Sequence, residues 1–421
     1  MVRPEIRKTA AALAVASALA VGYTQAHASA FALQEQNASG LGNSFAGAAA
    51  VAEDASTIFF NPAGLSLLPK GPNLSLGADW INFSTKFSNS NSVAATGRPL
   101  GNDGGEAGKD AIVPNLYFAM DVAPNLKAGI GISSPFGLKT DYDPNWIGRF
   151  QAIESKIESV NINPTIAYQV NDKLSLGGGL NYQSVKATLT QAVNAVALEG
   201  MANISGDDTG WGWNLGAMYQ ITPDTRLGVS YRSAIKFNIK GTAQFTGVPV
   251  ANQNVTLDLK VPDTLSFALS QKLSDTWTLL ADVTRTGWSS IKELKVVTDS
   301  GSTLQDTPEN FKNTWRYGIG ATQRMSDAWS LKVGFAFDQS PVNDTDRTAR
   351  LPDNDRTWLS IGGQYRVSST GKLDFGFAHL FIKNTSINQN GGVTTPPTVG
   401  TINGSYKASI NILGVQYSQT F

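Results

Sequence analysis

The stretch Trp329–Asp338, WSLKVGFAFD, decides the fold. Every second residue from Trp329 to Phe337 is large and apolar, whereas the residues between them are small, polar or charged and include Lys332 and Asp338. A period of two places alternate side chains on opposite faces of a β-strand. One face therefore meets an apolar phase and the other carries charge. Because aromatic residues lie near the ends of the apolar face, the pattern favours a transmembrane β-barrel over a soluble sandwich.

The same alternation recurs from Asn73 to the C-terminus in about fourteen segments, an even number as in other single-chain bacterial barrels. Tight turns such as Asn171-Asp172 alternate with long connections, which is typical of outer-membrane barrels. We therefore predict an all-β membrane protein with antiparallel strands near Asn73–Phe83, Ile112–Val122, Leu126–Lys139, Ile157–Val170, Lys173–Thr190, Gly210–Ile221, Arg226–Lys240, Asn254–Lys272, Trp277–Leu294, Asn313–Met325, Trp329–Gln339, Arg356–Val367, Lys372–Ile382 and Ser405–Phe421.

The closing strand contains two apolar stripes of opposite parity. The apolar residues from Leu413 to Tyr417 share the parity of Phe421, the last residue of the chain. A terminal aromatic residue on the lipid face is typical of outer-membrane barrels, and we expect the barrel-assembly machinery to recognise this strand. The apolar residues from Tyr406 to Ile412 have the opposite parity. Either a bulge shifts the phase near Ile412, or the strand meets apolar surroundings on both sides.

Met1–Ala28 is typical of a secretory signal peptide. Basic residues precede the apolar run Ala10–Val21, and Ala26-His27-Ala28 supplies a small-x-small cleavage pattern. The apolar run is too short for a membrane-spanning helix, which needs about 20 residues. We predict cleavage between Ala28 and Ser29, and N-terminal sequencing of the exported protein checks it. A mature chain that starts more than a few residues away would contradict this prediction.

The composition excludes several classes of protein. Lys+Arg and Asp+Glu both number 33, so no basic excess points to nucleic acid. The chain has no Cys, and a hydrophobic content of 41% is too low for a helical membrane protein. His379 is the only His after the signal peptide, and neither a Ser-His-Asp pattern nor metal-ligand spacing is present. We expect a protein that is not an enzyme and that uses no metal or cofactor.

A Gly- and Ala-rich segment, residues 29–70, lies between the signal peptide and the strands. It contains a short candidate helix, Ala46–Ala52, and the turn Asn61-Pro62-Ala63-Gly64, in which Pro62 restricts its own φ and biases Asn61 towards extended conformations. Small residues allow close backbone packing. We therefore predict three parts: a signal peptide (1–28), a plug within the barrel lumen, here called the hatch (29–70), and the barrel itself (71–421).

Two blocks of sequence resemble the FadL family of outer-membrane transport proteins (OMPP1/FadL/TodX). The first is the hatch segment with Asn61-Pro62-Ala63, which corresponds to the family's NPA motif; the second is Phe335–Val367, with its SPV and LPDND sequences. The resemblance covers the whole chain after the signal peptide. It implies a fourteen-stranded barrel with an N-terminal hatch that imports long-chain fatty acids or, in some members, aromatic hydrocarbons.

The resemblance also implies a route. Family members release substrate sideways through a kink in the third strand, and here Ser134, Pro135, Phe136 and Gly137 occupy that place. Pro135 cannot donate to a ladder and Gly137 weakens a strand, so a bulge or gap is expected there; the alternative is an ordinary strand end.

Two loop segments are candidates for an extracellular apolar groove. One lies after the third strand and the other has apolar residues near helical spacing; the alternative is that the two segments bury these faces against each other. The groove residues are Trp146, Ile147, Phe150, Val193, Val196 and Met201. A fatty-acid carboxylate also requires a cation, although most lumen charges in barrels form ion pairs with neighbours. The candidates for carboxylate binding are Arg232, Arg316, Arg324, Arg350 and Arg356.

We therefore expect import of hydrophobic molecules, with long-chain fatty acids first and aromatic hydrocarbons as the alternative. A general diffusion porin is a second class of function, which the predicted hatch argues against. An adhesin or phage-receptor role of the long loops is a third reading that the sequence neither supports nor excludes. The expected partners are hydrophobic small molecules, membrane lipid and lipopolysaccharide, without nucleic acid, and we expect a monomer.

Overall fold

The computed structural model describes residues 30–195, 197–389 and 396–421. The predicted signal peptide, Ser29 and Val196 lie outside these residues. Twenty strand segments form one antiparallel sheet. They are β1 (Asn73–Asn89), β2 (Ala111–Ala123), β3 (Leu126–Ser133), β4 (Gly137–Asp141), β5 (Glu154–Gln169), β6 (Leu174–Ala195), β7 (Leu198–Thr222), β8 (Thr225–Arg232), β9 (Ile235–Thr246), β10 (Gln253–Val261), β11 (Thr264–Lys272), β12 (Trp277–Thr286), β13 (Glu293–Thr298), β14 (Thr303–Pro308), β15 (Thr314–Arg324), β16 (Trp329–Asp338), β17 (Arg356–Arg366), β18 (Gly371–Ile382), β19 (Thr385–Gln389) and β20 (Ile402–Thr420).

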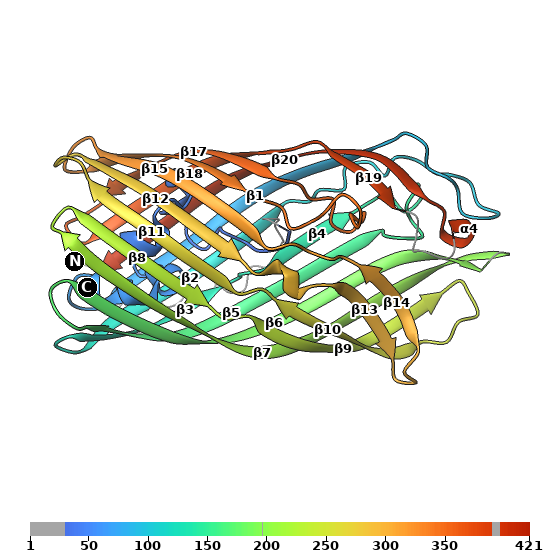
Figure 1. Cartoon of the computed structure of the whole chain (residues 1–421), viewed down its shortest axis with the longest axis horizontal. Coiled ribbons are helices and arrows are strands. Elements are labelled where there is room, and N and C mark those ends of the chain that lie inside the picture. The colour runs from blue at the N-terminus through green and yellow to red at the C-terminus, as the bar shows by residue number, and fades with distance from the viewer. Residues whose placement is uncertain (1–29, 196, 390–395) are drawn as a thin grey trace, which may run out of the picture.

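The sheet closes on itself, because β1 pairs with both β2 and β20. Six wall strands consist of two consecutive pieces, namely β3 with β4, β8 with β9, β10 with β11, β12 with β13, β14 with β15, and β18 with β19. The barrel therefore has fourteen wall strands, as the alternation predicted. The C-terminus lies at the end with the short turns, and the long hairpins extend from the other end (Figure 1). In outer-membrane barrels these ends are periplasmic and extracellular, respectively.

Alternation in the strands matches the observed burial. In β16, Trp329, Leu331 and Val333 are exposed on the outer face, whereas Lys332 and Asp338 are buried in the lumen. The aromatic and aliphatic outer face therefore meets lipid. Within the described residues, none of the helices has the length and apolar character needed to span a bilayer.

Several predicted strands differ from the observed ones. Asn254–Lys272 is divided into β10 and β11 at Pro262, which has no N–H for a ladder. Residues 191–195 and 197–201, predicted near helical spacing, instead belong to the long β6–β7 hairpin, whose ladder continues to Ala195↔Leu198. The cross-strand ladder overrides the local apolar spacing there.

The two stripes of the closing strand have a simple explanation. β20 pairs with β1 in one register from Asn73↔Thr420 to Asn89↔Gly404, so there is no bulge. Ile410 and Ile412 are fully buried in the lumen, whereas Leu413 and Tyr417 are exposed on the outside. The strand therefore meets apolar surroundings on both faces, with lipid outside the barrel and the apolar core of the lumen inside.

Residues 30–68 lie inside the barrel and contain four short helical turns. These are η1 (Leu41–Asn43), α2 (Ala48–Val51), α3 (Thr57–Phe60) and η2 (Pro62–Leu67). A 3-10 turn, η3 (Trp288–Ser290), interrupts the wall, and α4 (Pro396–Val399) lies in an extracellular loop. η1 packs against β15 to β18, α2 against β8 and β11, and η2 against β5 to β7. The hatch segment thus touches the wall around most of the lumen.

Wall glycines make this close packing possible. A Cβ on Gly177 would overlap the backbone of Ala63, and a Cβ on Gly228 would overlap the Ala49 carbonyl. Asn61 ties the hatch to the same part of the wall, since its side-chain amide donates to the carbonyls of Ala49 at 2.7 Å, Ala217 at 3.1 Å and Val229 at 3.3 Å. The Asn61 side-chain oxygen also caps η2 by accepting from the Ala63 N–H at 3.1 Å.

Candidate functional site

The wall has a break at the predicted kink. β3 pairs with β2 and β5, but β4 pairs only with β5. Residues Ala111–Asn115 of β2 accordingly pair with β1 alone. Pro135 lies in the break and has no N–H to continue the ladder. This missing ladder between β2 and β4, here called the wall gap, contains Ser134, Pro135 and Phe136 and ends at Gly137.

The N-terminal arm, Ala30–Gln36, lies against the inner side of the wall gap. The Leu33 N–H donates to the Pro135 carbonyl at 2.8 Å, and the Gly137 N–H donates to the Phe31 carbonyl at 2.8 Å. Gln36 adds a bond from its side-chain amide to the Ser134 carbonyl at 2.9 Å. Backbone groups that would otherwise be unpaired are thereby satisfied by a segment that is not part of the wall.

A cavity of about 400 Å³ passes beside the arm at this place. It is lined by lumen-facing side chains and by side chains of the outer face, so it reaches both sides of the wall. Its lining includes Leu33, Ile112, Val113, Ser134, Phe136, Gly137, Glu158, Ser159 and Val160. The cavity lies where the ladder between β2 and β4 is missing.

A second cavity, of about 90 Å³, lies in the lumen between the arm, the hatch and the wall, and is here called the lumen pocket. Apolar hatch side chains line one side, and Arg232, Asp282 and Arg316 line the other. The apolar lining consists of Ala32, Leu33, Phe45, Ala48, Ala49, Phe59, Phe60, Pro135, Phe136 and Pro262. Above it the lumen is also apolar, since Ile235, Phe237, Leu257, Leu259 and Trp288 form one buried cluster with Phe31.

The family follows from comparison of this chain with known proteins. The profile of the family described as "Outer membrane protein transport protein (OMPP1/FadL/TodX)" matches residues 19–421. The chain belongs to the OMPP1/FadL/TodX family. This membership confirms the resemblance seen in the sequence and places the protein in the bacterial outer membrane.

Individual relatives agree with this assignment. The long-chain fatty acid transport protein of Escherichia coli K12 is 29% identical over 425 residues, which cover 90% of this chain and 94% of that protein. The 47 kDa outer membrane protein of Pasteurella multocida is 30% identical and covers 97% of both chains. Among solved structures, a Pseudomonas aeruginosa FadL homologue has a TM-score of 0.87 at 23% identity over 93% of this chain and all of that one. The toluene transporter TodX of Pseudomonas putida has a TM-score of 0.66 at 18% identity over 94% and 100%.

Arg232 differs from the other charged residues of this family member's lumen. Its guanidinium donates to the Asn181 side-chain oxygen and, at 3.0 Å, to the Phe59 carbonyl, and it lies 4.3 Å from the centre of the Phe59 ring. Among the described residues, no carboxylate lies within 4.0 Å of it. A cation without a described carboxylate within this distance therefore lines the lumen pocket, beside its apolar hatch side chains.

The other four predicted arginines occupy different environments. Arg316 is 3.4 Å from Asp282, and Arg356 is 2.6 Å from Asp353, so both are paired. Arg350 is buried and donates to the side-chain oxygens of Ser155 and Gln191. Arg324 is exposed at the periplasmic rim, far along β15 from the pocket. Only Arg316 lines the lumen pocket together with Arg232.

The predicted extracellular groove is wrong in its geometry. Trp146, Ile147 and Phe150 are buried, with Trp146 stacked on Tyr142 at a centroid distance of 3.9 Å. Val193 and Met201 lie on the β6–β7 hairpin instead of a helix, and Val196 lies outside the described residues. The reason is that Trp146 has contacts within its own loop, where its ring N–H donates to the Ala152 carbonyl at 2.6 Å.

Phe31 is a site residue that the sequence did not reveal. It is buried, and its ring lies 4.8 Å from that of Trp288 and 5.8 Å from that of Phe136. A single Phe after a signal peptide carries no pattern that could have indicated this position. Its role is visible only in the folded structure, because its partners Phe136 and Trp288 lie far away in the sequence.

Proposed function

We propose that the protein imports hydrophobic compounds with an anionic head, long-chain fatty acids first among them. The observation that carries this proposal is Arg232, a cation without a described carboxylate within 4.0 Å that lines the lumen pocket beside apolar hatch side chains. An alkyl chain gains about 0.8 kcal/mol per methylene buried in an apolar site. A cation in the same pocket favours a carboxylate over a neutral hydrocarbon. The names of relatives such as the Escherichia coli long-chain fatty acid transport protein support the same substrate class.

The proposed route has two steps. Substrate enters the apolar lumen, reaches the lumen pocket and displaces the arm, whose Phe31 occupies apolar space between Phe136 and Trp288. It then leaves sideways through the wall gap, so that the alkyl chain passes from an apolar pocket into lipid without crossing water. Among the described residues, three hydrogen bonds hold the arm on the gap, two between backbone groups and one from the Gln36 side chain, and this small number favours an arm that can withdraw.

Binding of oleate and of toluene to the purified protein tests the substrate class. We expect Arg232→Gln to weaken oleate binding by about 10- to 100-fold, since a hydrogen bond to a charged group contributes about 1.5–3 kcal/mol. Toluene binding should not change, because a neutral ring has no need of the cation. Arg324→Gln, at the exposed rim, is the matched control and should bind both ligands as the unaltered protein does.

The alternative is import of aromatic hydrocarbons, as the name of TodX suggests for that protein. The lumen pocket has aromatic side chains that suit a ring, including Phe59 and Phe60. Tight toluene binding together with weak, Arg232-independent oleate binding would favour this alternative. A large, steady conductance of the unaltered protein would instead favour a general diffusion porin.

A further inference from the structure

The wall has a second interruption, on a different set of strands. β11 pairs with β12 up to Thr264↔Thr286, and β10 pairs with β13 only from Leu257↔Val296 outward. Between these points the backbone of Asp258–Asp263 faces Gly287–Lys295 without a ladder pair among the described residues. We call this stretch the seam. Two single bonds cross it: the Gly287 N–H donates to the Asp263 carbonyl at 2.9 Å, and the Ser290 hydroxyl donates to the Lys260 carbonyl at 3.1 Å.

The seam lies at the same height along the barrel as breaks in the neighbouring wall strands. β8 ends at Arg232 and β9 starts at Ile235, β10 ends at Val261 and β11 starts at Thr264, and β12 passes through η3 before β13. In Figure 1 the kink at η3 interrupts the middle of the barrel face between β12 and β13. Pro262 and the turn at Trp288 cause the interruption, because neither supplies a regular ladder. Three neighbouring wall strands therefore weaken together.

The lumen pocket extends to this seam. Its lining includes Pro262, Thr264 and Thr286 at the seam, and Pro135 and Phe136 at the wall gap on the other side. Trp288 is fully buried behind the seam, and its ring contacts Phe31 of the arm at 4.8 Å and Phe311 at 6.0 Å. Phe31 of the arm thus packs against Trp288 at the seam and, at 5.8 Å, against Phe136 at the wall gap.

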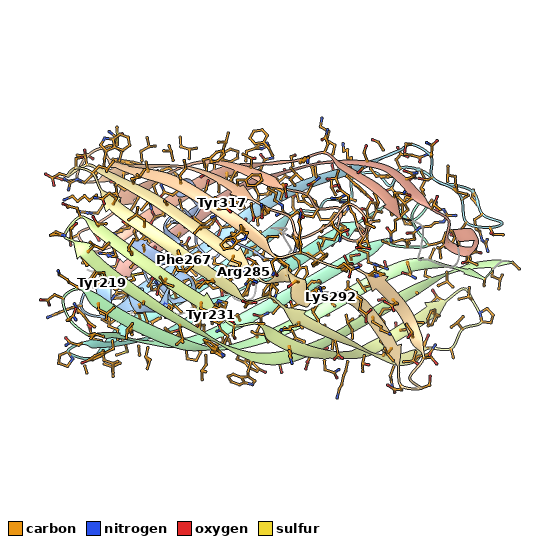
Figure 2. The ribbon with its side chains drawn as sticks, in the orientation of Figure 1. Tyr219, Tyr231, Phe267, Arg285, Lys292 and Tyr317 are labelled. Atoms are coloured by element: carbon orange, nitrogen blue, oxygen red, sulfur yellow. The ribbon has the colours of Figure 1, made fainter. Side chains whose placement is uncertain are left out.

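The outer side of the seam carries charge at the edge of the lipid-facing surface. Arg285 lies on the outer face, one-third exposed, 3.6 Å from Asp263. Lys236 and Lys260 are direct cross-strand partners, both exposed, an arrangement of like charges that destabilises a sheet. Figure 2 shows Arg285 and Lys292 on the same side of the barrel, with Tyr231 and Phe267 nearer the periplasmic end. Nearby carboxylates are Asp258, whose side chain accepts from Asn238 at 2.7 Å, and Glu293.

We propose that the seam is a second lateral passage, through which anionic amphiphiles dissolved in the outer leaflet enter the lumen pocket. The basic rim holds the carboxylate at the height of the lipid headgroups, where charged groups are stable. The alkyl chain then replaces Trp288 and Phe31 between the weakened strands. Entry through the seam and exit through the wall gap would use different walls of one pocket. This inference rests on the proposed function, since it names the same class of substrate.

Two matched serines allow a direct test, because the chain has no Cys of its own. Ser290→Cys places a thiol in the seam. Ser409→Cys places one on the outer face of β20, where the ladder is complete on both sides through Ser84 and Phe381. Each variant is labelled with bimane in lipid vesicles, and dibrominated stearate is added as the quencher. We expect saturable loss of fluorescence at position 290 and only a linear loss from lipid partition at position 409.

The same variants test transport in cells. Attachment of a bulky maleimide polymer to Cys at position 290 should reduce uptake of labelled oleate, and attachment at position 409 should not. Equal quenching at both positions, or unchanged uptake after labelling of position 290, would overturn the second passage. Oleate binding that still depends on Arg232 would then leave the proposed function standing, whereas loss of that dependence would reject the function itself.

Discussion

Deletion of Pro135 should abolish fatty-acid uptake while the barrel still folds. The deletion removes, from the three residues that separate β3 from β4, the one without an N–H, so the ladder with β2 can continue past Ser133. The register with β5 already shifts by one residue between Ser133↔Asn161 and Gly137↔Glu158. A deletion of one residue therefore keeps β4 on its present partners and faces in a continuous strand, whereas a deletion of two would reverse its faces. The cavity through the wall gap would close, because a paired strand leaves no room for an alkyl chain between its neighbours.

Uptake of labelled oleate by cells with equal amounts of heat-modifiable, folded barrel measures the effect. Gly137→Trp is a second way to fill the same cavity without changing the chain length, since Gly137 is buried in its lining. Both variants should retain oleate binding to the lumen pocket, because Arg232 lies on β8. Normal uptake by both variants would mean that substrate passes straight to the periplasm, and the lateral exit would be rejected.

The barrel was predictable because the alternation that specifies it depends only on residues that are neighbours in the sequence. Alternation between Leu331, Lys332 and Val333 needs only the two-residue period of a strand and two different solvents. The hatch turn at Asn61 was predictable for a similar reason, since Pro62 restricts the backbone wherever it occurs. Breaks such as the one at Pro262 were missed because a longer apolar alternation continues across them.

The arrangement of the site was less accessible, because it depends on contacts between distant segments. Five arginines qualified as cations for a carboxylate, and only the positions of Asp282 and Asp353 in space show that Arg316 and Arg356 are already paired. The apolar ring of the loop residue Trp146 would suit an extracellular groove as well as the buried core in which it lies. Its burial also depends on Phe87 of the distant strand β1, whose ring lies 5.9 Å from that of Trp146.

The hatch packs against wall positions where glycine leaves room for its backbone. One substitution at such a position should therefore have a large effect. Gly177→Leu should displace the NPA turn, because even a Cβ at this position overlaps the backbone of Ala63 and Pro62. Backbone cannot rotate away as a flexible side chain can, so η2 must move inward as a unit. Loss of the Asn61 bonds to β7 and β8 should follow. We expect the lumen to open and single-channel conductance to rise well above that of the unaltered protein.

Gly178→Leu is the matched control, one residue further along β6 and on the lipid face. A Cβ there would have the Leu215 side chain as its nearest neighbour, at 3.0 Å, and that side chain can rotate in lipid. The two variants therefore have the same composition and strand propensity, and differ only in the face that receives the new side chain. Conductance should rise in Gly177→Leu alone. A rise in both would point to a weakened strand, and a rise in neither would show that the turn at Asn61 does not close the lumen.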